Sequence, residues 1–504
     1  MILLGIPLGY KMPSIFRKEF FQKIINIFPK ITGEIFIYGL GGSLAQFVGL
    51  VTIPIITRIF SSAEFGTVDV INATSGYFAV LITLNIGSGL MRHFYEISTE
   101  AAKDRQKMVS SLVWFTIIFG GLVVFLGSLL SSNLSQLLFS RKDYALAISL
   151  ALASLPFASL KEIFASVLRM QRKPINFLVL NILYAIINFL LTLLFVLGFK
   201  WGINGFFAAQ IVSGVFISLA SAWQCRDFVR FAFSKKWFYS MASYGVPMLP
   251  GSLLNWGMMS INRILLTQFT TESQIAYFSV ATKTAKVIEL AVTAFIMGWM
   301  PVFLANINSE SFHKKLDKVL RYYIYATLSL SALVTIFAKE LFYILAPPEY
   351  QVGSSLVALL CLKQAITGTT YIFTVGIVQC KKTYLVSVST GIGIITTVLI
   401  SLLLSPHYGI FGAAIADAVG ILVYAILTFI FSNHLKKLGW DIKPIIWAPL
   451  SYLLLWLLSI IIGFPNLYSD LLFRVGLLGL FLFFVFVIID RSKLLKTLLT
   501  SITH

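Results

Sequence analysis

Residues 201–205 read Trp-Gly-Ile-Asn-Gly and residues 408–412 read Tyr-Gly-Ile-Phe-Gly, so one motif occurs twice, 207 positions apart. A second short match has nearly the same offset, because Arg172-Lys173 recurs as Lys381-Lys382. A long internal repeat in a mostly apolar chain is typical of a transporter built from two similar lobes. The repeat therefore predicts a two-lobed fold with a substrate path between the lobes.

The composition places most of the chain in a lipid bilayer. Of its 504 residues, 58% are hydrophobic and only 12% are charged, whereas a soluble domain carries about 25% charged residues. Apolar runs of about 20 residues, the length that spans a bilayer, recur between short polar segments. We predict an all-α integral membrane protein with fourteen transmembrane helices near 35–57, 69–91, 109–131, 145–168, 176–198, 203–224, 241–268, 277–305, 320–345, 353–379, 384–404, 409–432, 445–463 and 471–490.

The distribution of Lys and Arg supports this topology and sets its orientation. With a cytoplasmic N-terminus, the cytoplasmic segments hold 28 of these residues and the opposite segments hold 5. The positive-inside rule predicts this asymmetry when spans and orientation are correct. Both termini are therefore expected in the cytoplasm. Much of the net charge of +19 reflects topology, and nucleic acid is not an expected partner.

The charge count also defines the predicted domain organisation. Each copy of the repeat covers six helices, and an even number returns the chain to the same side of the membrane. The lobes should therefore form a parallel repeat. The predicted parts are a cytoplasmic segment at 1–34, an N-lobe at 35–232, a C-lobe at 233–440, and two extra helices with a cytoplasmic tail at 441–504.

The N-terminal segment has a pattern of its own. Residues 13–29 combine Phe and Ile with Arg and Lys, which predicts an amphipathic helix on the inner membrane surface. No cleavage site of small residues follows a suitable apolar core, so we expect no signal peptide. Met12 is a possible alternative start to Met1.

Several motifs in the first half of the chain resemble a known family. Residues 57–60 read Thr-Arg-Ile-Phe, a Ser-Ser-Ala-Glu-Phe-Gly turn follows at 61–66, and the next helix ends Gly-Leu-Met-Arg-His-Phe-Tyr-Glu at 89–96. With Tyr-Gly-Val-Pro-Met-Leu-Pro-Gly-Ser-Leu at 244–253, they resemble the polysaccharide-biosynthesis branch of the multidrug/oligosaccharidyl-lipid/polysaccharide (MOP) transporter superfamily, which includes O-antigen flippases. The resemblance implies a MATE/MOP-like fold and a flippase of lipopolysaccharide or related glycan assembly in the bacterial inner membrane. Many members have an acid just before the arginine that matches Arg263, where this chain has Asn262.

Charged residues at membrane depth are costly, so each is a candidate functional residue. Lys283, Lys286 and Glu289 are spaced i, i+3, i+6 along the helix predicted at 277–305, which places them on one face. Other such residues lie on other predicted helices: Arg58, Lys161, Glu162, Arg263, Lys363 and Asp417.

The resemblance implies a central cavity lined by the first, second, seventh and eighth helices. Those helices carry Arg58, Arg92, Arg263, Lys283 and Lys286. Since Arg and Lys bind phosphate well, we expect these five residues, together with Lys363, to hold the phosphate or pyrophosphate head of an undecaprenyl- or other polyprenyl-linked oligosaccharide. The glycan would then cross to the outer leaflet by alternating access.

Simpler roles compete for several of these residues. Arg92 fits an anchor at the inner interface, Arg58 can reach the outer headgroups, and Lys286 can pair with Glu289. Lys283 and Lys363 cannot easily reach an interface, so a functional role is favoured most strongly for them.

No catalytic residue, metal site or cofactor is expected. The three cysteines have no metal-ligand spacing, and no Walker sequence is present. Coupling to a proton or sodium gradient, or to the membrane potential, would use Glu289 or Asp417. Other glycan-assembly membrane proteins are possible partners.

Two alternatives stay open. A MATE-type multidrug/cation antiporter of the same superfamily would resemble a twelve-helix protein, often with an acid inside its first helix, whereas here two more helices are predicted. A membrane glycan polymerase needs acids or a nucleophile on a sizeable outer loop, and no predicted outer segment much exceeds about a dozen residues.

Overall fold

The computed structural model describes residues 49–94, 102–306, 309–462 and 467–489. Within these ranges all regular structure is helical, and eleven helices are long and apolar enough to cross a membrane. The other three predicted spans coincide with Gly49–Ile59, α11 (Leu249–Leu266) and α12 (Glu272–Asn306). The predicted all-α membrane fold is therefore confirmed. The amphipathic helix predicted at 13–29 and both chain ends lie outside the described residues.

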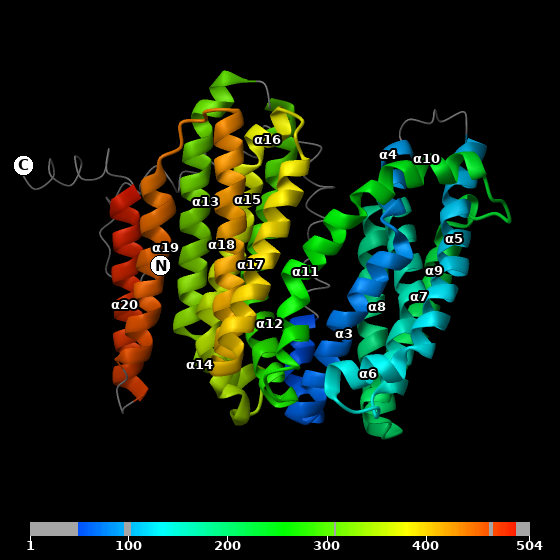
Figure 1. The fold of residues 1–504 in the computed structure, drawn as a ribbon, viewed down its shortest axis with the longest axis horizontal. Helices are drawn as coiled ribbons and strands as arrows, with labels where there is room; N and C mark the ends of the chain where they lie inside the picture. Colours follow the sequence, from blue (N-terminus) through cyan, green and yellow to red (C-terminus); the bar gives the residue numbers. More distant parts are fainter. Residues whose placement is uncertain (1–48, 95–101, 307–308, 463–466, 490–504) are drawn as a thin grey trace, which may run out of the picture.

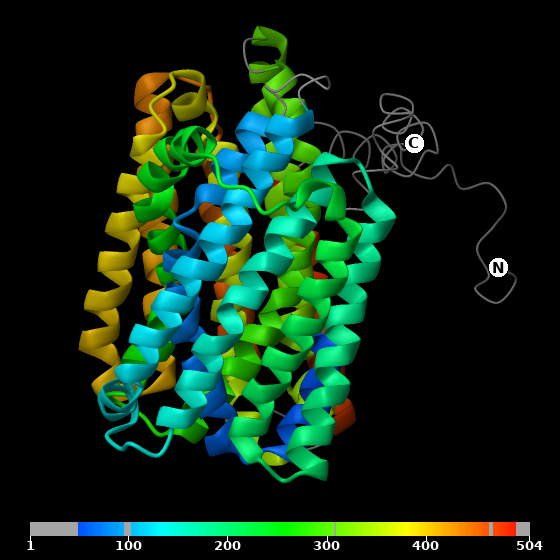
Figure 2. The same ribbon diagram turned by 90° about the vertical axis from the view of Figure 1, so that its right-hand side faces the viewer.

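The helices form two bundles that lie side by side in Figure 1. The first consists of α3 (Ser62–Thr83), α4 (Ile86–Phe94), α5 (Ala102–Leu129), α6 (Ser131–Phe139), α7 (Ala145–Met170), α8 (Pro174–Leu193), the π-helical turn η3 (Leu194–Gly198) and α9 (Gly202–Gln224). A short turn, η4 (Arg226–Phe228), leads out of it. Seen from the side in Figure 2, most of these helices run along a common axis.

The second bundle begins with α12 and includes the helices beyond the repeat. Its other members are α13 (Glu310–Ile336), α14 (Ala338–Leu345), η6 (Pro348–Leu356), α15 (Val357–Phe373), α16 (Val375–Gln379), α17 (Tyr384–Tyr408), α18 (Ile410–Leu435), α19 (Ile442–Ile461) and α20 (Leu467–Ile489). Between the bundles, α10 (Lys235–Gly245), η5 (Val246–Met248) and α11 descend obliquely from one to the other. The bundles lie close together at the end where the start of α12 contacts the start of α3, and they diverge toward α4 and α16 (Figure 1).

The start of α3 differs from the sequence prediction, which placed a turn at 61–66 and began the helix at residue 69. The helix begins at Ser62 because Ser61 and Glu64 form a capping box. The Ser61 hydroxyl accepts from the backbone N–H of Glu64, and the Glu64 carboxylate accepts from the N–H of Ser61. These bonds satisfy backbone donors that a helix start leaves unpaired. The predicted turn is therefore wrong, and Asp69 lies about two turns inside the helix.

Two of the predicted spans are interrupted. The span predicted at 69–91 breaks at Leu84 and Asn85, which both have left-handed backbone angles. The span predicted at 241–268 divides into α10, η5 and α11 around Pro247 and Pro250. Proline lacks a backbone N–H and restricts the residue before it, so closely spaced prolines interrupt a helix.

The repeated motifs have repeated backbone geometry. Arg172 and Lys381 have φ of 55° and 58°, and the following residues donate backbone hydrogen bonds back to Leu168 and Ile377, each of 3.0 Å. Gly202 and Gly409 have φ of 55° and 54°, a region that glycine adopts at little cost. The sequence match therefore reports a real structural correspondence, while the predicted lobe boundaries stay a prediction.

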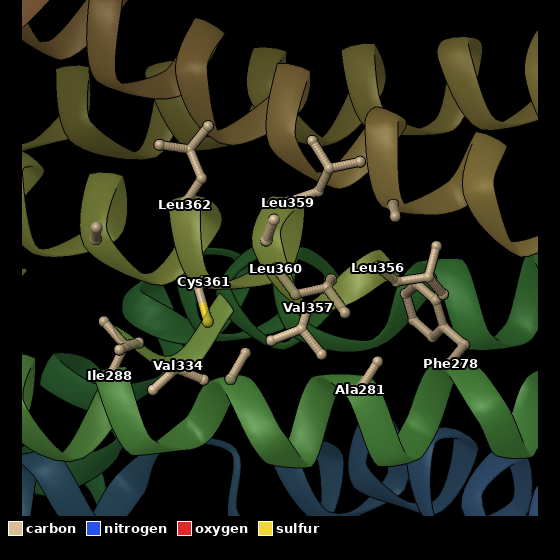
Figure 3. Close-up of a cluster of buried hydrophobic side chains, with 14 of the residues drawn as sticks. Phe278, Ala281, Ile288, Val334, Leu356, Val357, Leu359, Leu360, Cys361 and Leu362 are labelled. Carbon is tan, nitrogen blue, oxygen red and sulfur yellow. The ribbon is translucent and has the colours of Figure 1, made fainter. Parts of the chain in front are cut away.

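The core of the second bundle is apolar and joins three helices. Phe278, Ala281 and Ile288 of α12 face Val334 of α13 and a run of residues at the start of α15 in Figure 3. The run consists of Leu356, the last residue of η6, with Val357, Leu360 and Cys361 of α15, whereas Leu359 and Leu362 point to the opposite side of the helix.

The extra helices attach to this bundle through polar groups. Tyr452 of α19 donates to the Ala358 carbonyl at 2.9 Å and lies 2.6 Å from the Thr335 hydroxyl. Arg474 of α20 pairs with Asp470 of the same helix and, at 3.2 Å, with Glu340 of α14, which links α20 to the bundle. Unpaired polar groups in a bilayer are costly, so these contacts fix α19 and α20 to the bundle.

Candidate functional site

An acid on α3 lies between two cations of α11 and α12, where the bundles meet. The Asp69 carboxylate is 2.7 Å from Nε of Arg263 and 3.8 Å from Nζ of Lys283. Asp69 and Arg263 are mostly buried, while the Lys283 side chain is 28% exposed. The three residues are called the junction cluster below. Its ion pairs link the first bundle to α11 and α12.

Local packing sets the position of the cluster. The Trp256 indole of α11 donates to the Ala73 carbonyl of α3 at 3.0 Å, one turn beyond Asp69. A Cβ at Gly66 would lie 1.8 Å from the Glu272 carbonyl oxygen, so only glycine lets α3 and α12 approach so closely. Lys283 also lies 4.1 Å from the centre of the Phe65 ring, a cation–π contact.

Lys286 adds positive charge, and no described residue forms an ion pair with it. It lies one turn after Lys283 on α12 and contributes positive potential at Asp69. Among the described residues, no carboxylate lies within 4.0 Å of its ammonium, so the pairing with Glu289 considered from sequence is not formed. One Glu289 oxygen is buried and accepts no hydrogen bond from any described residue.

The structure separates Arg58 from this cluster. Arg58 donates to the carbonyls of Pro54 at 2.7 Å, Ile344 at 3.3 Å and Tyr343 at 3.4 Å. The last two carbonyls belong to the end of α14, where a cation is favourable. Arg58 thus fastens the helical segment Gly49–Ile59 to the second bundle, and its predicted substrate contact stays a prediction.

Arg92 lies at the opposite end of the molecule from Arg58. Its guanidinium is 4.5 Å from the centre of the Tyr244 ring on α10, and the neighbouring His93 is 3.3 Å from the Ser240 hydroxyl. These contacts join α4 to α10. Arg92 is exposed there, in agreement with an anchor, and its substrate role also stays a prediction.

Lys363 and Asp417, predicted separately as a substrate ligand and an ion site, form one pair. The Lys363 ammonium is 3.0 Å from the Asp417 carboxylate and donates to the Met258 carbonyl of α11 at 3.0 Å. The pair lies inside the second bundle, between α15 and α18, and shares no ion pair with the junction cluster.

Asn262 replaces the acid common in the family that the sequence resembles. Its amide donates to the Ala413 carbonyl of α18 at 2.9 Å. Arg263, the next residue, points to Asp69 instead. No salt bridge is needed at position 262, because an amide can donate to a carbonyl and a carboxylate cannot.

The bundles are also bound to each other beside α6. Arg141 forms a 2.6 Å ion pair with Glu272, and Gln268 donates to the Leu137 carbonyl at 3.0 Å. In the predicted orientation this end faces outward. The described contacts therefore close the predicted outer side, while the bundles diverge on the predicted cytoplasmic side (Figure 1).

Asp69 is the functional candidate that sequence reasoning missed. The predicted span began at Asp69, so the residue was treated as a helix end and not as a membrane acid. The capping box would have revealed it, since Ser61 and Glu64 start the helix earlier and place Asp69 at membrane depth.

Comparison with known proteins gives one family match. A family model described as polysaccharide biosynthesis protein matches residues 31–307, more than half of the chain. No curated protein sequence matches significantly.

Solved structures share the fold at low sequence identity. The lipid II flippase MurJ in an inward closed conformation matches with a TM-score of 0.67 at 15% identity, over 91% of this chain and 99% of that one. An inward-facing multidrug resistance MATE family transporter of the MOP superfamily matches with a TM-score of 0.61 at 16% identity, over 79% and 95%. A point mutant of the Vibrio cholerae MATE transporter VcmN matches with a TM-score of 0.57 at 18% identity, over 81% and 98%. The chain is thus a multi-pass membrane protein with a transporter fold.

Proposed function

This chain belongs to the polysaccharide biosynthesis protein family, and on that basis we propose that it is a lipid-linked oligosaccharide flippase. It would move a polyprenyl-(pyro)phosphate-linked glycan from the cytoplasmic to the outer leaflet of a bacterial inner membrane. The flippase among its structural relatives, MurJ, has the same fold, which supports the proposal at the level of architecture.

The cation surplus at the junction cluster carries the proposal. Arg263 and Lys283 share Asp69 where the bundles meet, and Lys286 has no acid within 4.0 Å among the described residues. Positive charge therefore exceeds directly paired negative charge here, which is costly at membrane depth unless a mobile anion or water compensates. A phosphate or pyrophosphate head fits this surplus, since guanidinium and ammonium groups bind phosphate through charge-assisted hydrogen bonds.

The same geometry suggests how binding drives movement. Asp69 and a substrate phosphate would compete for Arg263 and Lys283. Once phosphate takes these cations, the ion pairs between α3 and both α11 and α12 weaken, and the bundles can rock apart on the outer side. A ligand shifts a conformational equilibrium only through such differential contacts.

Glu289 and Asp417 are the two acids predicted to couple transport to an ion. Asp417 is already paired with Lys363, whereas Glu289 has a buried oxygen with no hydrogen-bond partner among the described residues. Of the two predicted ion sites, Glu289 is thus the better candidate for a coupled proton or sodium ion.

Multidrug export is the alternative that shares this fold, since MATE transporters match the chain over most of its length. The cation surplus favours an anionic substrate over a cationic drug. Direct efflux of cationic drugs from vesicles containing the protein would reverse the assignment.

The deciding experiment neutralises the three cations together. We expect Arg263→Gln, Lys283→Gln and Lys286→Gln in one chain to abolish glycan export while the amount of membrane-inserted protein stays unchanged. Surface glycan is measured in cells whose only flippase is the variant. Lys161→Gln serves as the matched control, because Lys161 is another membrane lysine that pairs with Glu162 away from the cluster. Normal export by the triple variant would refute the proposal.

A further inference from the structure

The proposed transport path does not use the ion pair of Lys363 and Asp417, whose substrate and ion roles stay predictions. Their side chains are only 11% and 7% exposed. The ammonium contacts two oxygens, one from the Asp417 carboxylate on α18 and one from the Met258 carbonyl on α11, each at 3.0 Å. One side chain of α15 thus joins two other helices.

The two oxygens are of the kind that bind small hard cations. Carboxylate and backbone carbonyl oxygens are the usual protein ligands of such ions. In this site the lysine ammonium takes the position of the ion. It supplies one positive charge against one carboxylate, so the pair is neutral, unlike the junction cluster.

A second contact one turn away repeats the arrangement. Asn262 donates to the Ala413 carbonyl at 2.9 Å. Asn262 follows Met258 by four residues, and Asp417 follows Ala413 by four, so both contacts lie on one face of α11 and one face of α18. The two contacts fix α11 against α18 in both position and rotation.

This attachment bears on the junction cluster through α11 itself. Arg263 directly follows Asn262 and pairs with Asp69 across the bundles. The helix that presents Arg263 to the first bundle is therefore held in place by Lys363 from the second.

We propose that the Lys363 ammonium is a tethered cation that fills an oxygen-lined cation site between α11, α15 and α18 and thereby fixes α11. The single carboxylate of this site matches the one positive charge of the ammonium, which stays in place because it is part of the chain. A variant without the lysine side chain should bind such a cation from solution. The proposal goes beyond glycan transport and does not depend on it.

The test uses purified protein in detergent without substrate, so a wrong transport assignment would not affect it. Lys363→Ala removes the atoms of n-propylammonium, and that ion is the probe, with bulky choline as the reference cation. In choline we expect the thermal unfolding midpoint of Lys363→Ala to lie roughly 5 °C or more below that of the unchanged protein, because Asp417 is left buried and unpaired. Propylammonium should restore about half of the loss, in proportion to the logarithm of its concentration.

Three controls separate a cation site from general packing. Lys363→Met fills the space with apolar atoms and should not respond to propylammonium. Lys363→Ala combined with Asp417→Ala leaves no lone charge, so it should melt above the single variant and also show no response. Lys161→Ala is the matched control in the first bundle, where the Glu162 side chain is 59% exposed and is therefore not left as a buried charge.

Two results would overturn the proposal. One is a Lys363→Ala variant that propylammonium does not stabilise, or stabilises no more than the unchanged protein. The second result concerns the case in which Lys363→Ala does not fold. The variant that combines Lys363→Ala with Asp417→Ala must then fold, and if it also fails to fold, the site has a packing role only.

Discussion

The junction cluster and the Lys363–Asp417 pair are both buried charge sites that contact α11, yet they differ in balance. At the junction, Arg263 and Lys283 share Asp69, and no acid of the described residues lies within 4.0 Å of Lys286. In the second bundle, one ammonium faces one carboxylate. The first site spans two bundles that can separate, and the second joins helices of a single bundle to α11.

The difference indicates a division of roles along one helix. A site with surplus charge, partly open to solvent through Lys283, can accept an exchangeable anion. A neutral site with both side chains about nine-tenths buried has no capacity for one and serves to hold helices together. Buried charge in a membrane protein is therefore not by itself a sign of substrate binding, and the local balance of charge decides the interpretation.

The largest expected effect is on stability, from removing the Asp417 charge. Asp417→Asn leaves the Lys363 ammonium buried without a counter-charge, and we expect a loss of about 3–5 kcal/mol. Asp69→Asn should cost less, because the Lys283 side chain is 28% exposed and solvent can screen part of the charge that loses its partner. Thermal unfolding of the two purified variants measures the contrast. Equal losses would remove the distinction between the two sites.

A smaller effect is expected on anion binding, from removing the Asp69 charge. Asp69→Asn frees Arg263 and Lys283 from their internal competitor, so affinity for pyrophosphate should rise by about tenfold, a typical coupling between linked sites. Titration of the purified protein with inorganic pyrophosphate, followed by thermal shift, measures it. Lys161→Gln, which changes a lysine paired with Glu162 away from the cluster, is the control and should leave this affinity unchanged. Weaker binding by Asp69→Asn would show that Asp69 helps to shape the anion site and does not compete for it.

Chemical labelling of cysteines perturbs the protein least and tests on which side of the membrane the bundles diverge. Cys380 is exposed near the end where the bundles diverge, whereas Cys225 and Cys361 are buried. Burial raises the pKa of the Cys225 thiol to about 11, so almost none of it is the reactive thiolate at neutral pH. We expect a membrane-impermeant maleimide to label only Cys380, and only from the cytoplasmic side. Labelling of Cys380 from outside the cell would contradict the predicted orientation and place the closed end of the bundles on the cytoplasmic side.

Sequence patterns predicted most of the fold because the cause is local. A bilayer requires about 20 apolar residues for each helix, and the positive-inside rule orients them. The errors fall where short-range hydrogen bonds or prolines act. The capping box moved the start of α3 to Ser62, and Pro247 and Pro250 interrupted the helix that continues as α11.

The candidate site was only half predictable. Helical spacing placed Lys283 and Lys286 on one face of α12, but it could not identify the acid that faces them. Lys363 and Asp417 were both found, yet their pairing was not, because residues far apart in sequence meet only when α15 packs on α18.

By itself, the sequence determined the helices, the repeat, the predicted orientation and the excess of cations at membrane depth, since each depends on residues close in the chain. Only the tertiary structure decided which cations share an acid and which stand in surplus. Helical periodicity gives the face on which a side chain lies. The packing of bundles decides what that face meets, so Asp69 lies opposite Arg263 and Lys283, and Asp417 opposite Lys363.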